Sequence, residues 1–147
     1  MRKRVQTARA ETSGMRSYAL QQTRTLLRRL AFQVSQTGRR GDADSVHDLR
    51  VAIRRFSQCL RVFEHYLPKP SVRKIRHSLK TMMARAAAVR DLDIAAELLH
   101  AGGIPKHARV LGALDKERRQ AEEKLLGTIR RSCRQNFSAK WRVKLEL

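Results

Sequence analysis

The apolar residues between positions 45 and 67 recur at steps of three or four, which is the spacing of an α-helix. On a helical wheel they fall within about 100° of one another and define a single core face. This face consists of Val46, Leu49, Ile53, Phe56, Leu60, Phe63 and Leu67. The stretch therefore predicts an amphipathic helix whose apolar face has to be buried in any fold of the chain.

Three further helices are predicted from the same periodicity and from the turn residues that separate them. The first covers 15–37, and the glycines and aspartates of 37–44 indicate a loop. The second ends at residue 67 before Pro68, the third covers 71–100 with a bend near Arg90, and the fourth covers 105–136 after a Gly-Gly turn. The apolar positions of the first helix are Leu20, Leu27, Leu30, Ala31 and Val34.

These elements predict an all-α fold, a single four-helix up-down bundle with long antiparallel helices over residues 15–136. Ser45 is the expected N-cap of the second helix, and Asp48 completes a pair that resembles a capping box. Residues 1–14 are basic and lack an apolar face, so we expect a mobile arm there. Residues 137–147 are expected to form a short helix or a tail.

The net charge points to a negatively charged partner. The chain carries 33 Lys and Arg against 13 Asp and Glu, a formal charge of +20, and 24 of the 33 are arginine. Nucleic acid, polyphosphate or an anionic membrane would neutralise such a surface, and arginine favours phosphate because its guanidinium can bind two oxygens at once. Cys59 and Cys133 are isolated, and no long apolar run is present, so we expect a protein of the cytoplasm with no membrane partner.

A basic stripe lies opposite the core face of the second helix. It contains His47, Arg50, Arg54, Gln58, Arg61 and His65, with Arg55 beside it, and extends for roughly 27 Å at 1.5 Å per residue. A solvated helix face normally mixes both signs of charge, as the stretch DKERRQAEEKLL at 115–126 does. The second helix does not mix them, which favours a binding surface over a solvated face.

The third helix carries a second basic cluster, formed by Arg73, Arg76, His77 and Lys80. If the second and third helices are antiparallel neighbours, the two clusters line one groove, and Arg24 and Arg28 of the first helix could form a side wall. For Arg90 two interpretations stay open. It could contribute to this site, or the aspartates that follow it could cap a helix restart or pair with it.

No catalytic motif is present, so we expect neither an enzyme nor a cofactor. His47 and Asp48 are adjacent and point in different directions on a helix, which excludes a dyad. The sequence contains five histidines, but three of them have basic neighbours that would repel a metal cation, and no carboxylate stands at ligand spacing. No metal site is predicted.

The segments VHDLRVAIRRF, CLRVF and LKTMMARAAAVRDLDI resemble the CHAD family, the conserved histidine α-helical domain. The resemblance implies a helical fold that binds inorganic polyphosphate through a basic channel. Position by position, it implies that the binding residues are His47, Arg50, Arg54, Arg55, Lys80 and Arg90. The helical wheel adds Arg61, Arg73 and Arg76. The chain departs from the family at Ala86-Ala87, where Leu-Gly is usual, and it carries one four-helix half where members normally carry two.

The expected function is non-enzymatic binding of inorganic polyphosphate in the cytoplasm, with polyphosphate granules as one location. The alternatives are a nucleic-acid-binding protein that uses the same basic face and a protein that acts on phosphorylated substrates. Because the chain has one half, we also expect a homodimer, with a monomer as the alternative. The apolar residues considered for the dimer surface are Phe32, Trp141, Val143 and the Ile129–Cys133 side of the fourth helix.

Overall fold

Helices make up nearly all of the chain. The computed structural model describes the backbone of residues 2–147 and the side chains from residue 13 onward. The elements are α1 (Arg2–Arg40), α2 (Ala43–Val62), the 3-10 helix η1 (Glu64–Tyr66), α3 (Lys69–Ala101), α4 (Arg109–Arg134) and α5 (Phe137–Lys144). No strand occurs in residues 2–147, which confirms the all-α prediction.

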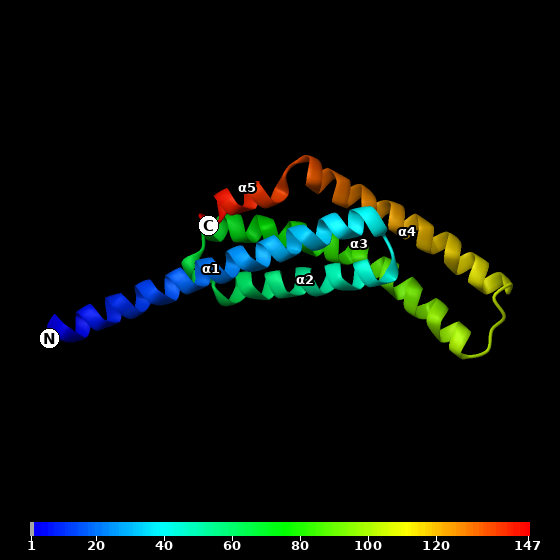
Figure 1. Ribbon diagram of the computed structural model, residues 1–147, viewed down its shortest axis with the longest axis horizontal. Helices are drawn as coiled ribbons and strands as arrows, with labels where there is room; N and C mark the ends of the chain where they lie inside the picture. Colours follow the sequence, from blue (N-terminus) through cyan, green and yellow to red (C-terminus); the bar gives the residue numbers. More distant parts are fainter. Residues whose placement is uncertain (1) are drawn as a thin grey trace.

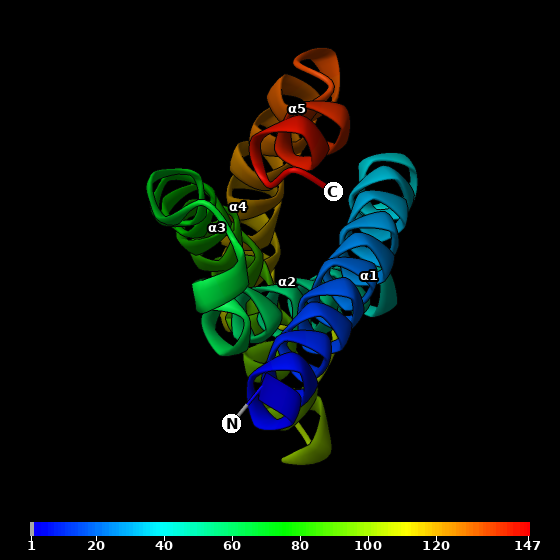
Figure 2. The same ribbon diagram turned by 90° about the vertical axis from the view of Figure 1, so that its left-hand side faces the viewer.

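The helices α1 to α4 alternate in direction and form an up-down bundle, and α5 continues in the direction of α4 (Figure 1). Each helix packs on the next, and α1 also packs on α4 and α5, which closes the bundle. Figure 2 looks along the bundle and shows α1 and α3 on opposite sides, with α2 below and α5 above them. The far half of α3 and the first half of α4 continue past the other helices as a two-helix hairpin (Figure 1).

The core forms where the predicted apolar faces meet. The α2 face is buried as expected, with Phe63 partly buried at its edge, and it packs on Leu27, Leu30 and Val34 of α1. The last residues form the short helix that was one of two expectations for 137–147. Trp141 of α5 stacks on Phe56 at a centroid distance of 6.2 Å, so α5 covers the end of the core.

Trp141 and Ile129 were considered for a dimer surface, and this prediction is wrong because both are core residues, 9% and 2% exposed. The exposed large apolar residues include Phe32 and Val143. An aromatic side chain near the end of a chain can close a core as well as extend from it, and the sequence alone does not distinguish the two.

The helix boundaries differ from the prediction at several ends. The helix expected from residue 15 begins at Arg2, so the backbone of 2–14, the predicted arm, is helical; residue 1 and the side chains of 1–12 lie outside the described residues. Extending a helix that has already nucleated costs little, and no proline interrupts this stretch. At the other ends, α2 stops at Val62 before a 3-10 turn, and α4 starts at Arg109 because residues 102–108 form a turn.

The predicted N-cap of α2 is also wrong. Asp42 occupies that position, and its Oδ1 accepts a hydrogen bond of 2.9 Å from the backbone N–H of Ser45. Ser45 is buried in the first turn and donates its hydroxyl to the Asp42 carbonyl. The hydrogen bonds from the Ser45 backbone and side chain, together with nearby Arg40, lower the pKa of Asp42. Asp48, the expected capping partner, is exposed one turn further on.

Candidate functional site

A groove of about 790 Å³ lies between α2 and α3. Its floor is apolar, since Ile53, Val72 and Leu79 belong to the core. Burial of the two core faces fixes how each helix is rotated about its axis, and that rotation turns the polar faces of both helices toward the groove. We call this feature the α2–α3 groove; it is lined by Ile53, Arg54, Ser57, Gln58, Arg61, Glu64, Lys69, Val72, Arg73, Arg76, His77, Leu79, Lys80, Met83 and Ala84.

Six cationic side chains line the α2–α3 groove: Arg54, Arg61, Lys69, Arg73, Arg76 and Lys80. All six are exposed, and none of them forms an ion pair with a carboxylate among the side chains of residues 13–147. One carboxylate, Glu64, lines the groove at its η1 end. The groove therefore concentrates positive charge over an apolar floor, and this arrangement can hold a chain of phosphate groups.

Five of the nine site residues named from the sequence meet in this groove: Arg54, Arg61, Arg73, Arg76 and Lys80. The expected antiparallel packing of α2 on α3 brings them together. The predicted side wall is wrong, because Arg24 and Arg28 do not line the groove. Arg28 instead lines a separate hollow between α1 and α2.

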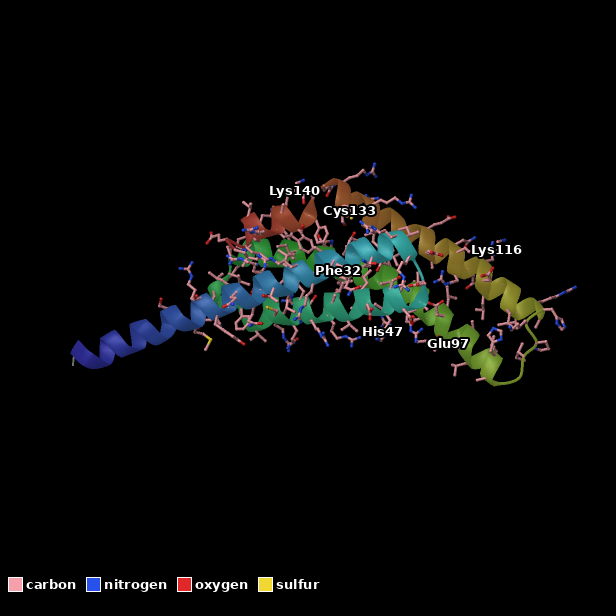
Figure 3. All side chains as sticks on the ribbon, viewed as in Figure 1. Phe32, His47, Glu97, Lys116, Cys133 and Lys140 are labelled. Carbon is pink, nitrogen blue, oxygen red and sulfur yellow. The ribbon has the colours of Figure 1, made fainter. Side chains whose placement is uncertain are left out.

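The other four site residues lie outside the groove lining. Figure 3 shows His47 near the N-terminal end of α2, pointing away from the bundle, and its side chain is exposed. Arg50 lies one turn before Arg54 and is half-buried, and its Nε is buried without a hydrogen-bond partner. Arg55 faces the α1 side of α2 and lines two hollows there. Arg90 forms an ion pair of 3.2 Å with Glu97.

Two basic residues of the groove lining were missing from the predicted site, Lys69 and His77. Lys69 stands between two prolines that were interpreted only as a helix stop, yet it is the first residue of α3. Proline is well tolerated in the first turn of a helix, so Pro70 could have indicated a start as well as a stop. His77 was recognised in the basic cluster of the third helix, and the structure places it in the groove lining beside Arg76.

Asp93, one of the two aspartates that follow Arg90, pairs with an arginine of α4. Its Oδ1 accepts a hydrogen bond of 2.8 Å from Arg118 on α4, so it neither caps a helix nor pairs with Arg90. Arg118 also binds Glu122 at 2.6 Å and donates to the Gly41 carbonyl at 3.0 Å. Burial opposes the charge of Arg118, but the hydrogen bond and charge of Asp93, with Glu122, raise the pKa of this guanidinium.

Arg118 thereby links α3, α4 and the turn between α1 and α2. The mixed charges of 115–126 predicted a solvated face, and at Arg118 this prediction is wrong. The turn depends on Gly41, which has a φ of +63°, and a Cβ at this position would collide with Glu122. Arg119 next to it forms an exposed i,i+4 ion pair with Asp115, as expected for a solvated face.

No group of three His, Cys, Asp or Glu side chains is placed to hold a metal ion in the part of the chain that the structure describes. Within the same part, none of the helices combines the length and the apolar character that crossing a membrane requires.

Residues 21–147 match the family model of the CHAD domain. The chain belongs to the CHAD family. The match covers all of α2 to α5 and α1 from residue 21 onward, so the α2–α3 groove lies entirely within it. CHAD domains are known as polyphosphate-binding. No curated protein and no solved structure matches the chain.

Proposed function

We propose that this CHAD protein binds inorganic polyphosphate in the α2–α3 groove and catalyses no reaction on it. The observation that carries the proposal is the set of six exposed cations in one groove, without ion-pair partners among the described side chains and with one carboxylate, Glu64, beside them. Family membership supports the choice of polyphosphate among polyanions.

The unbound groove contains repulsive contacts that a bound polyanion would relieve. Arg73 and Arg76 are three residues apart, and Arg76 and Lys80 are four apart, so these like charges are neighbours on one helix face. Each such pair costs a few tenths of a kcal/mol in an isolated helix. A phosphate chain laid between α2 and α3 would convert this repulsion into attraction on both walls.

The shape of the groove favours an extended, flexible ligand. Along α2 the lining runs from Ile53 to Arg61, roughly 12 Å at 1.5 Å per residue, and it continues past η1 to the start of α3. The guanidinium groups can each bind two phosphate oxygens, whereas Lys69 and Lys80 act as point charges. The lining supplies six cations that can bind phosphate and a single carboxylate, Glu64, so it has no pair of carboxylates for acid–base chemistry. Binding without reaction is the function that this lining supports best.

A competition experiment tests the proposal. Labelled long-chain polyphosphate is bound to the full chain at physiological salt, and unlabelled polyphosphate or duplex DNA is added at equal phosphate concentration. We expect polyphosphate to displace the label at much lower concentration than DNA, because a flexible phosphate chain can follow the cations of both walls, whereas a rigid duplex holds its phosphates in a fixed helix. Equal displacement by both would favour the nucleic-acid alternative, and no binding of the label would refute the proposal.

The proposal also covers location and assembly. We expect a fluorescent fusion of the protein to lie in the cytoplasm and to gather at polyphosphate granules. We further expect that polyphosphate bridges two copies into a homodimer, since the basic grooves of two unliganded copies at +20 each would repel one another.

A further inference from the structure

A hollow of about 550 Å³ lies between α1 and the C-terminal half of α2, next to the α2–α3 groove. We call it the α1–α2 hollow. Its lining is more apolar than that of the α2–α3 groove. Its lining consists of Tyr18, Gln22, Leu26, Arg54, Arg55, Gln58, Cys59, Val62 and Phe63.

The hollow exposes an aromatic ring beside aliphatic side chains. Tyr18 is 53% exposed and Val62 is 57% exposed, so neither is covered by the rest of the bundle. The edge of one ring meets the face of the other in the Tyr18–Phe63 pair, at a centroid distance of 6.1 Å and an interplanar angle of 81°. Leu26 is half-buried and Cys59 is buried beneath them. Exposed aromatic rings of this kind are surfaces on which a planar base stacks.

Polar groups stand at the rim of the hollow. Gln22 of α1 and Gln58 of α2 each present an amide with two donors and one acceptor oxygen, which suits the edge of a nucleobase. Arg54 and Arg55 add two cations, and neither forms an ion pair with any carboxylate in residues 13–147. An apolar site with a few convergent polar groups is the usual composition of a small-molecule site.

The hollow and the α2–α3 groove meet on α2. Arg54 and Gln58 line both of them, so a ligand with a planar end and a phosphorylated end can span the two. We propose that a nucleoside 5′-polyphosphate binds here, with its base against Tyr18 and Val62 and its phosphates crossing Arg54 into the groove. The placement of the phosphates rests on the function proposed for the groove, while the placement of the base rests on the hollow alone.

The test compares ATP with tripolyphosphate, which carries phosphates but no base. Binding of each to the full chain is measured by titration calorimetry at physiological salt without divalent cations. We expect ATP to bind about tenfold more tightly than tripolyphosphate, the effect of stacking one base. The double variant Tyr18→Ser with Val62→Gln should bind ATP no more tightly than tripolyphosphate, and its affinity for long-chain polyphosphate should not change.

The variant Val143→Ser is the matched control. Val143 is 78% exposed on α5 and does not line the hollow, so this variant should keep the preference for ATP. The proposal is overturned if the wild-type protein binds ATP and tripolyphosphate equally, or if the double variant keeps the preference. Either result would refute the nucleotide proposal alone if the wild-type protein still binds long-chain polyphosphate. If the wild-type protein does not bind long-chain polyphosphate, the proposed function is refuted as well.

Discussion

Removing two cations from the α2–α3 groove should weaken polyphosphate binding in a way that bulk charge cannot explain. The change is Arg61→Ala together with Arg76→Ala, one residue from each wall. Both side chains are exposed, and neither forms an ion pair with a described carboxylate, so the fold should tolerate the change. Neither lines the α1–α2 hollow, which keeps this test separate from the nucleotide proposal.

The size of the effect follows from the openness of the groove. A hydrogen bond to a charged group contributes about 1.5–3 kcal/mol when it is shielded, but solvent and salt reduce this at an exposed site to about 1 kcal/mol. Two contacts then contribute about 2 kcal/mol, and their loss weakens binding about 30-fold. If each of the six groove cations releases about 0.7 of a counterion, the plot of log K against log salt has a slope of about −4, which should become about −3 in the variant.

The assay is equilibrium binding of labelled polyphosphate over a series of salt concentrations, with circular dichroism to verify the helical fold. The control variant, Arg130→Ala with Arg131→Ala, removes the same charge from exposed positions of α4 that do not line the groove. The control should lose far less affinity. Equal losses of affinity and equal changes in slope for both variants would mean that net charge, and not this groove, binds the polyanion.

The ion pairs of Arg118, the Asp42 cap, the two cysteines and the proposed dimer can each be tested separately. Arg118→Ala leaves two partly buried carboxylates without their partner, so it should lower the free energy of unfolding by about 2–3 kcal/mol and the thermal midpoint by roughly 5–10 °C. The control Arg119→Ala breaks an exposed ion pair and should change the midpoint little. The pKa of Asp42 is lowered in the folded state, so its carboxylate stabilises the fold above pH 3.8, the unfolded pKa, and this stabilisation is lost as the pH falls below that value. The drop in thermal midpoint on acidification should therefore be smaller in Asp42→Asn. Burial raises the pKa of Cys59, so a thiol reagent should label one cysteine, Cys133, in the native protein and both only after unfolding. In sedimentation, polyphosphate of a few tens of phosphates should yield a dimer, and a 16.9 kDa species with and without it would contradict the proposed assembly.

Most of the helices, and the walls of the groove, could be predicted from periodicity. The spacing of Val46, Leu49 and Ile53 predicts a helix and the face of it that is buried. The residues on the opposite, exposed face are then known from the helical repeat. The two basic clusters were found in this way, and antiparallel packing places the second cluster and the Arg54–Arg61 part of the first in one groove. Local signals were less reliable, since Asp42 and Ser45 are both good caps and only the backbone decides which one is used.

Long-range pairing could not be predicted. The near neighbours of Arg118 in sequence suggest a solvated side chain. Two of its partners are distant in sequence, since Asp93 lies 25 residues earlier and the Gly41 carbonyl 77 residues earlier. Arg90 and His47 were named through the family resemblance, yet one pairs with Glu97 and the other points into solvent beyond the groove. Motif positions identify residue types, whereas the partners of each side chain depend on packing.

Both walls of the groove come from one helical hairpin, α2 and the first half of α3, joined by η1 and its flanking residues. The groove is therefore built from contacts between residues close in sequence, which form early in folding because little chain entropy is lost in closing short loops. The far half of α3 and the first half of α4 project past the other helices and supply no residue to the lining, so local opening at their tip would leave the geometry of the groove in place. The binding surface and the stability of the far end of the molecule can consequently change independently of one another during evolution.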